Sequence, residues 1–204
     1  MSLFDKMKNQ AAETTRQAMS QAAQNLTSAA AAPSGANKSV SVVFPSIPGS
    51  LDAFAALPQA AMLNPFDTAA LFILAIGLYK VDKSISIAMI NHLKGPQALN
   101  QHDLSFLADR MAQNGKVDFI AESYFDGATP QNDYTPTEPY TVAVSENPYS
   151  YQEQGYARLL IRSGGADEPR AITLRSAKDG KWYLWEYSSI LMDIRAPEST
   201  NPWT

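Results

Sequence analysis

The sequence predicts an α+β fold in which a helical segment packs on an antiparallel β-meander, behind an N-terminal helical arm. Two observations predict this class. Residues 64–114 carry apolar side chains at helical spacing, whereas tyrosine, proline and β-branched residues become frequent from about residue 117 onwards. A block of helices followed by a block of strands is typical of α+β folds, because the elements of α/β folds alternate along the chain.

The N-terminal arm differs from the rest of the chain in composition. Residues 1–32 contain no proline or glycine and are rich in alanine, glutamine, threonine and serine, and residues 32–37 have the composition of a linker. The apolar stripe of the arm is weak because alanine supplies most of it. We therefore predict that residues 1–36 are a helical or disordered arm with its linker, and that residues 37–204 form a single α+β domain.

Apolar patterns and capping residues predict the first elements of the domain. A short strand is expected over residues 39–44. Asn64 precedes a proline and has the form of a helix start, Asp82 has the form of a second N-cap, and Asn100 with Asp103 resembles a capping arrangement for a third helix. Three helices are therefore expected in succession, and the first of them should be central because it is apolar on nearly every side.

Four strands are expected after the helices, over residues 141–145, 156–162, 171–177 and 181–187. A two-residue turn at Asp179-Gly180 would join the last two. With that turn, Leu174 faces Trp185 on the side that packs against the helices. Arg175 and Glu186 are expected on the opposite face, close enough to pair diagonally.

Composition narrows the range of functions. The 16 basic residues against 20 acidic ones leave a net charge of −4, which argues against general nucleic-acid binding. There is no cysteine, and the only two histidines, His92 and His102, lie on different predicted helices, so no metal site or cofactor is expected. The sequence also contains no phosphate-binding loop, dinucleotide-binding turn or nucleophile motif. No catalytic residue is assigned, and an enzyme is not favoured.

Tyrosine is concentrated in one segment of the chain. Six of the nine tyrosines fall between residues 124 and 156, among prolines and glycines. Tyrosine combines an apolar face with a polar tip, which suits a binding surface. It suits equally a long loop that packs upon itself. The candidate ligand- or partner-binding residues in this segment are Tyr124, Tyr134, Tyr149 and Tyr151.

Arginine clusters in the hairpin that follows. Arg158, Arg162, Arg170 and Arg175 all belong to it, and Arg162 is expected opposite Arg170 beside a loop that carries two acidic residues. Either these acids neutralise the arginines in internal salt bridges, or the arginines bind an anion or a partner's carboxylate. Arg162 and Arg170 are the candidate binding residues.

The arm begins with an amphipathic tip formed by Leu3, Phe4 and Met7. Two roles are open for this tip: insertion into an anionic membrane surface, or contact with a protein partner or with a second copy of the chain. Protein contact is favoured, because the arm carries few basic residues to attract anionic lipids. The apolar run over residues 69–78 is too short to span a membrane, and the absence of cysteine mildly favours a cytoplasmic location.

Several strings of the domain resemble a known family, namely Leu63-Asn-Pro-Phe-Asp67, Ser123-Tyr-Phe-Asp-Gly127, Asn147-Pro-Tyr-Ser-Tyr151, Arg162-Ser-Gly-Gly-Ala-Asp167 and Lys181-Trp-Tyr-Leu-Trp185. Over about residues 50–204 the chain resembles an uncharacterised bacterial family that is catalogued as a domain of unknown function. The resemblance implies a bacterial origin and one domain, and it brings no activity or catalytic residues. The order of elements also looks like the cone-shaped folds of the nuclear-transport-factor-2 type, which house enzymes and non-enzymes alike.

Together these observations predict a non-catalytic binding or interaction module, with the loop surface from Tyr124 to Tyr156 as the contact. One alternative is a small-molecule pocket protein, or an enzyme such as a hydrolase or isomerase, with its site between helices and sheet. Another alternative is a membrane-surface protein anchored by the arm. A deep apolar pocket with convergent polar groups favours the pocket protein, whereas a filled core with aromatic residues on one rim favours the interaction module.

Overall fold

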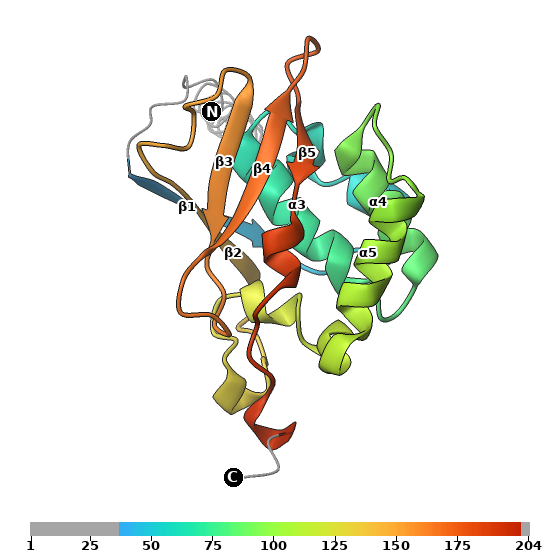
Figure 1. Ribbon diagram of the computed structural model, residues 1–204, viewed down its shortest axis with the longest axis vertical. Helices are drawn as coiled ribbons and strands as arrows, with labels where there is room; N and C mark the ends of the chain where they lie inside the picture. Colours follow the sequence, from blue (N-terminus) through green and yellow to red (C-terminus); the bar gives the residue numbers. More distant parts are fainter. Residues whose placement is uncertain (1–36, 201–204) are drawn as a thin grey trace, which may run out of the picture. The chain divides into compact units, whose positions relative to one another are not determined.

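A sheet of five antiparallel strands organises the domain in the computed structural model, which describes residues 37–200 (Figure 1). Neighbouring strands follow the order of the sequence: β1 (Lys38–Phe44), β2 (Tyr140–Glu146), β3 (Tyr156–Ile161), β4 (Arg170–Ser176) and β5 (Trp182–Glu186). The predicted α+β class and the antiparallel meander of the last four strands are therefore confirmed.

The first strand pairs with the second, although the whole helical segment separates the two strands in the sequence. β1 pairs with β2 over its full length, from Lys38 opposite Glu146 to Phe44 opposite Tyr140. Val42 and Phe44 of β1 are buried and alternate with exposed side chains, which is the pattern of a strand with one face on the core. The strand predicted at residues 39–44 is thus part of the domain and forms one edge of its sheet.

The central helix is α3 (Pro65–Gly77), as its apolar composition predicts. The side chain of Asn64 caps the helix by accepting a hydrogen bond from the Phe66 N–H at 3.1 Å. The helix is buried without interruption from Thr68 to Ile76, because it lies against all five strands of the sheet. Thr68, a polar member of this run, satisfies its hydroxyl by donating to the Trp182 carbonyl at 2.9 Å.

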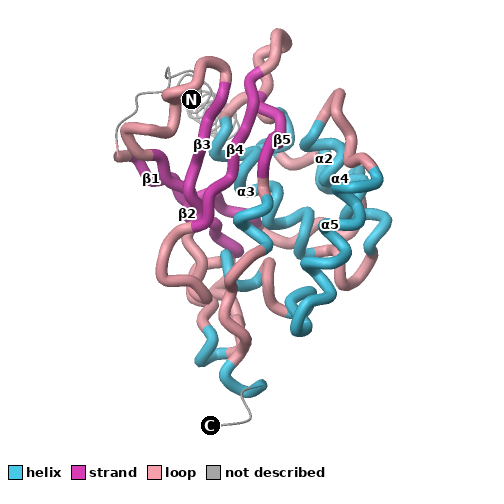
Figure 2. The backbone as a smooth tube through the Cα atoms, viewed as in Figure 1, coloured by secondary structure: helices cyan, strands magenta, loops and turns pink. Residues whose placement is uncertain are grey.

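Two further helices, α4 (Lys83–Lys94) and α5 (Gln101–Ala112), start at the predicted N-caps. A short helix that the sequence patterns did not predict, α2 (Leu51–Ala55), precedes them. Figure 2 shows α2, α4 and α5 together on one side of the strands. α4 is tied to α3 by the buried hydroxyl of Ser86, which donates to the Ala75 carbonyl at 2.6 Å.

The other face of the sheet carries polar and aromatic side chains. Arg158 and Arg175 are exposed there, and Tyr156 and Thr173 are half-buried. In Figure 1, α3 lies behind β3 and β4, and no described helix lies in front of them. The sheet therefore presents side chains of β3, β4 and β5 to solvent. No helix within residues 37–200 combines the length and the apolar character that a membrane crossing demands.

Candidate functional site

The hairpin between β4 and β5 differs from its predicted form by one residue. Ala177 N–H donates to the Lys181 carbonyl at 2.9 Å, so the loop has three residues instead of two, and Gly180 closes it with φ +79°. A three-residue loop that ends in a left-handed residue is a common hairpin form. Leu174 consequently lies opposite Leu184, and the predicted pairing with Trp185 is wrong.

The three-residue loop places Trp185 on the solvent side, and a β-bulge lies opposite it in β4. Consecutive residues of β4, Thr173 and Leu174, pair with Glu186 and Leu184, which leaves Trp185 without a partner in β4. Leu184 is buried and Trp185 is 39% exposed, the reverse of the prediction that Trp185 faces the helices. Bulges are frequent next to functional sites, so the exposed tryptophan beside this bulge marks a candidate site.

Three residues from three strands form an aromatic–cationic group beside the bulge, here called the β5 cluster: Tyr156, Arg175 and Trp185. The Arg175 guanidinium lies 4.7 Å from the centroid of the Trp185 ring and 5.5 Å from that of the Tyr156 ring. The two rings meet edge to face at 5.7 Å. Arg175 therefore stacks on aromatic rings, and the predicted diagonal ion pair with Glu186 is absent from the described residues.

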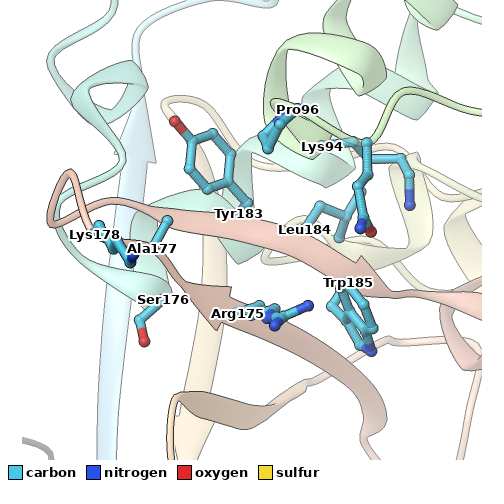
Figure 3. Close-up of a pocket in the computed structure, with 10 residues that line it drawn as sticks. Lys94, Pro96, Arg175, Ser176, Ala177, Lys178, Tyr183, Leu184 and Trp185 are labelled. Carbon is cyan, nitrogen blue, oxygen red and sulfur yellow. The ribbon is translucent and has the colours of Figure 1, made fainter.

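A hollow of about 290 Å³ adjoins the β5 cluster and is here called the β5 cleft (Figure 3). One wall comes from the end of α4 and the loop after it, and the other from β4, β5 and their loop. Its lining residues are Lys94, Pro96, Gln97, Arg175, Ser176, Ala177, Lys178, Tyr183, Leu184 and Trp185. Segments that are far apart in the sequence thus meet in one surface site.

The wall between the helix end and the sheet depends on Gly95 and Tyr183. Gly95 ends α4 with φ +59°, and a Cβ at this position would collide with the Tyr183 ring. The Tyr183 hydroxyl donates to Asp179 Oδ2 at 2.7 Å, and this hydrogen bond lowers the pKa of the Asp179 carboxyl. The tyrosine is therefore held between the end of α4 and the hairpin loop.

The charged side chains that line the β5 cleft are all positive. Three of its ten lining residues, Lys94, Arg175 and Lys178, are cationic and none is acidic, although the whole chain carries a net charge of −4. Lys94 Nζ lies 5.9 Å from the centroid of the Tyr187 ring, and none of the three cations forms an ion pair within residues 37–200. The cleft combines an apolar floor with three cations that form no ion pair within residues 37–200.

A second hollow, of about 270 Å³, also has Trp185 in its lining and is here called the α5 hollow. It shares Lys94 and Trp185 with the β5 cleft. The rest of its lining is mixed in charge: His102, Asp103, Phe106, Glu186, Tyr187 and Ser188. The two hollows adjoin at Lys94 and Trp185, and together they are here called the groove across Trp185.

Two of the predicted tyrosines are buried. Tyr124 donates to the Ile190 carbonyl at 2.7 Å, and Tyr134 donates to the Arg195 carbonyl at 2.6 Å. Burial raises the pKa of the Tyr134 hydroxyl to about 12 and that of Tyr124 further still. Both rings hold the C-terminal segment against the loop, so neither lies on a surface that a partner reaches. For these two, the loop-packing alternative applies.

The other two tyrosines lie at the β2–β3 connection. Tyr149 is 66% exposed, and Tyr151 is half-buried and donates to Glu146 Oε2 at 2.8 Å. Neither residue lines the β5 cleft. The structure therefore separates the four predicted tyrosines into two that support the core and two that lie elsewhere on the domain.

The arginine hairpin has a different pairing from the predicted one. Arg170 lies opposite Ile161, so Arg162 is not its partner, and Arg170 Nη2 donates to the Asp193 carbonyl at 2.7 Å. The loop acid Asp167 forms its ion pair with Arg195, at 3.0 Å between Oδ1 and Nη1. The predicted neutralisation of the hairpin arginines by Asp167 is wrong. Arg162 is exposed and lines a separate hollow of about 510 Å³.

The remaining predicted residues contribute no site within the described part of the chain. Leu3, Phe4 and Met7 lie outside the described residues. Residues 37–200 contain no group of three or more histidine, aspartate or glutamate side chains placed to hold a metal ion. His92 packs edge to face on Phe54 at 6.0 Å between ring centroids, while His102 lines the α5 hollow.

The sequence patterns therefore did not identify this candidate site. They indicated Arg175 only as one of a group and placed Trp185 in the core. The signals in the sequence were the aromatic string Lys181-Trp-Tyr-Leu-Trp185 and the glycine at position 95. Neither signal identifies a site alone, because the site exists only where the end of α4 meets β5.

Comparison with known proteins identifies the family of this chain. The sequence model of a domain of unknown function, DUF6935, matches residues 46–198, well over half of the 204-residue chain. No curated protein and no solved structure matches the chain significantly. The match begins within a few residues of the start predicted from the resemblance and extends through β5. The chain therefore belongs to the DUF6935 family.

Proposed function

We propose that this protein is a non-catalytic binding module and that the β5 cleft, together with the β5 cluster, is its contact surface. The observation that carries the proposal is Trp185, exposed at a β-bulge and stacked on Arg175 beside an open hollow. The few residues that dominate the binding energy at protein interfaces are enriched in tryptophan, tyrosine and arginine. All three residue types meet here on rigid strands.

The packing of the domain supports a surface site. Between α3 and the sheet, the side chains of Leu71, Phe72, Leu159 and Leu174 are fully buried. The Phe72 and Tyr187 rings pack against each other at an angle of 45°, with 4.8 Å between their centroids. This interface is filled with apolar side chains, and Trp185, an exposed large aromatic residue, lines a hollow at the surface. Such an arrangement favours recognition at a rim.

A second candidate function is the binding of a small anionic molecule in the β5 cleft. The volume of about 290 Å³ is close to the lower end of the range for small-molecule sites, about 300–1,000 Å³. The cleft lies where the end of a helix meets the sheet, as the pocket-protein alternative expects. The open groove across Trp185 is better suited to an extended chain, so we favour a peptide ligand.

Selection from a random-peptide library tests the proposal. We expect the full-length protein to enrich peptides that bind the wild type and bind Trp185→Ser at least about tenfold more weakly, as the loss of a hot-spot residue does. Tyr149→Ser is the matched control, because Tyr149 is a more exposed aromatic residue outside the cleft. Fluorescence anisotropy with labelled synthetic peptides measures the affinities, and circular dichroism checks that both variants fold.

Two outcomes contradict the peptide-binding proposal. In the first, no peptide is enriched reproducibly. In the second, the enriched peptides bind wild type, Trp185→Ser and Tyr149→Ser equally. If no peptide is enriched but a small aromatic carboxylate such as phenylpropionate raises the melting temperature of the wild type and not of Trp185→Ser, the second candidate function is supported instead.

The remaining expectations about setting are proposals as well. The strings that resemble the bacterial family fit a bacterial source, and the absence of cysteine fits a cytoplasmic location. Contact of the N-terminal arm with a partner or with a second copy is a separate proposal, which concerns residues outside the described part. The likeness to the nuclear-transport-factor-2 cone is a hypothesis about architecture alone.

A further inference from the structure

We infer that the groove across Trp185 binds an acidic segment of a partner protein, with an aspartate or glutamate in the β5 cleft next to an apolar residue over Trp185. This inference rests on the proposed function and specifies its ligand. It follows from the distribution of charge, from the donors that the cleft leaves unused, and from the mixed character of the α5 hollow.

Arg175 is prepared to bind a carboxylate. Its guanidinium packs against the Trp185 and Tyr156 rings, which restricts its side chain before any ligand arrives. Within residues 37–200 its guanidinium donates no hydrogen bond and forms no ion pair. The N–H donors of Arg175 are therefore available for a planar anion, and a carboxylate accepts such donors in pairs.

The neighbouring side chains select for the same chemistry. Lys94 and Lys178 add positive charge from the two walls of the cleft, and no acidic residue lines it. The floor is apolar, since Leu184 is 2% exposed and Pro96 lies beside Tyr183 (Figure 3). A ligand that matches both properties carries a carboxylate and an apolar side chain close together.

The α5 hollow differs in charge from the β5 cleft, so the two ends of the groove favour different ligand residues. Its carboxylates, Asp103 and Glu186, each accept a backbone hydrogen bond, from the Asn100 N–H at 3.2 Å and from the Ser188 N–H at 2.7 Å. Lys94 lies at the junction with the β5 cleft, and the excess of positive charge lies on the hairpin side of Trp185. The acidic residue of the ligand therefore belongs in the β5 cleft, and a neutral or basic residue in the α5 hollow.

The charge of the chain itself points to a separate partner. The arm, residues 1–36, carries three basic and two acidic residues, so it does not complement a cationic cleft. A like-charged segment placed against Lys94, Arg175 and Lys178 would be repelled. The occupant that fits is an acidic segment of another protein.

Matched synthetic peptides test the inference. The probes are labelled peptides with a central Glu-Phe or Asp-Leu pair, the same peptides with Gln or Asn in place of the acid, and the peptides selected from the random library. We expect the acidic probes to bind at least about tenfold more tightly than their amides, and their affinity to fall several-fold between low and physiological salt. Anisotropy measures both effects.

Two variants locate the carboxylate. Arg175→Gln and Lys178→Gln are expected to weaken the acidic probes by about tenfold or more and to leave the amide probes unchanged. Lys83→Gln is the matched control, since Lys83 is an exposed cation that packs on the Tyr79 ring, 5.4 Å from its centroid, and does not line the cleft. Fluorescence quenching of the ligand-free wild type is a further measurement. The anion iodide should quench the fluorescence of Trp185 more strongly than the cation caesium does, because the cleft is positively charged. The difference between wild type and Trp185→Phe isolates the signal of Trp185.

The outcomes separate this inference from the proposed function. If selected peptides bind in a Trp185-dependent way but are neutral or basic, insensitive to salt and insensitive to Arg175→Gln, the inference is wrong and the binding module stands. Equal quenching of Trp185 by iodide and caesium also contradicts it. If no peptide of any composition binds, both the module and its acidic ligand are contradicted.

Discussion

Trp185 shows how a single position in a hairpin decides a surface. One additional loop residue places Leu184 inside and Trp185 outside, and the bulge at Thr173 and Leu174 then restores the register for Glu186. Because side chains of a strand alternate between its two faces, a shift of one residue exchanges buried and exposed sets. The candidate site owes its tryptophan to this local irregularity.

Asp67 is a residue whose ionisation affects stability. It is a half-buried carboxylate in the first turn of α3, and loss of solvation raises its pKa from 3.8 to about 6. The folded chain therefore binds a proton here more readily than the unfolded chain does. The stability that results is fully present below about pH 4 and is lost as the pH rises through about 6.

We predict that Asp67→Asn stabilises the domain at pH 7 by about 1–2 kcal/mol, after allowance for solvent that still screens the half-buried group. The variant should also lose part of the decrease in stability between pH 4 and 7. Urea unfolding at several pH values measures both effects, with Asp52→Asn, at an exposed site in the first turn of α2, as the control. Burial raises the pKa of Glu122 in the same direction, so the difference between wild type and variant is the informative quantity. A lower stability of Asp67→Asn at pH 7 would contradict the prediction.

At the scale of elements, α5 shows how local sequence sets a boundary. Asn100 Oδ1 accepts from the His102 and Asp103 N–H groups at 2.8 and 3.0 Å, and Asp103 Oδ2 accepts from the Asn100 N–H at 3.2 Å. This reciprocal capping satisfies N–H groups that no helical carbonyl reaches. The start of α5 also carries His102 and Asp103 of the α5 hollow, so the cap positions part of the groove.

We predict that Asn100→Ala destabilises the domain by about 1 kcal/mol, because it leaves two helix N–H groups without their side-chain acceptor. The melting temperature should fall by about 2–4 °C. Gln101→Ala is the neighbouring control, as its exposed side chain donates or accepts no hydrogen bond within residues 37–200. Differential scanning calorimetry compares the three proteins, and equal melting temperatures for Asn100→Ala and wild type would show that the cap contributes nothing.

At the scale of the whole molecule, β1 marks where the folded domain begins along the chain. Its seven residues pair with β2 from Lys38 onwards, and Phe44 is completely buried. Everything before residue 37 lies outside the described part. The sequence predicts a separable arm there, since the arm has few large apolar side chains to bury and ends in a linker.

We predict that deletion of residues 1–36 leaves the domain folded, with a melting temperature within about 3 °C of the full-length protein. Deletion of residues 1–44 is the control, because it removes β1 and exposes the edge of β2, and this protein should unfold or aggregate. Circular dichroism and size-exclusion chromatography distinguish the two. Unfolding of the shorter deletion would place the boundary elsewhere, and co-sedimentation of the full-length protein alone with anionic liposomes would support the membrane alternative for the arm.

The sequence by itself determined the class of the fold and most of its elements. Asn64, Asp82, Asn100 and Gly95 mark helix ends because their hydrogen bonds and backbone angles involve residues at most four positions away. Strand positions followed from alternation in the same way. The short α2 was missed because a helix of five residues is too short for its apolar spacing to stand out.

Tertiary structure alone decided the site. Tyr124 and Tyr134 are buried because their hydroxyls find carbonyls of the distant C-terminal segment, and no local pattern reveals that partner. Trp185 is exposed because Leu184 pairs with Leu174 on the buried face of the sheet, which leaves the next residue on the other face. The β5 cleft exists because the end of α4 meets β5 through Gly95 and Tyr183. Contacts within a turn of helix or between neighbouring residues can be predicted from local sequence patterns, whereas contacts between distant segments depend on the packing of the whole domain.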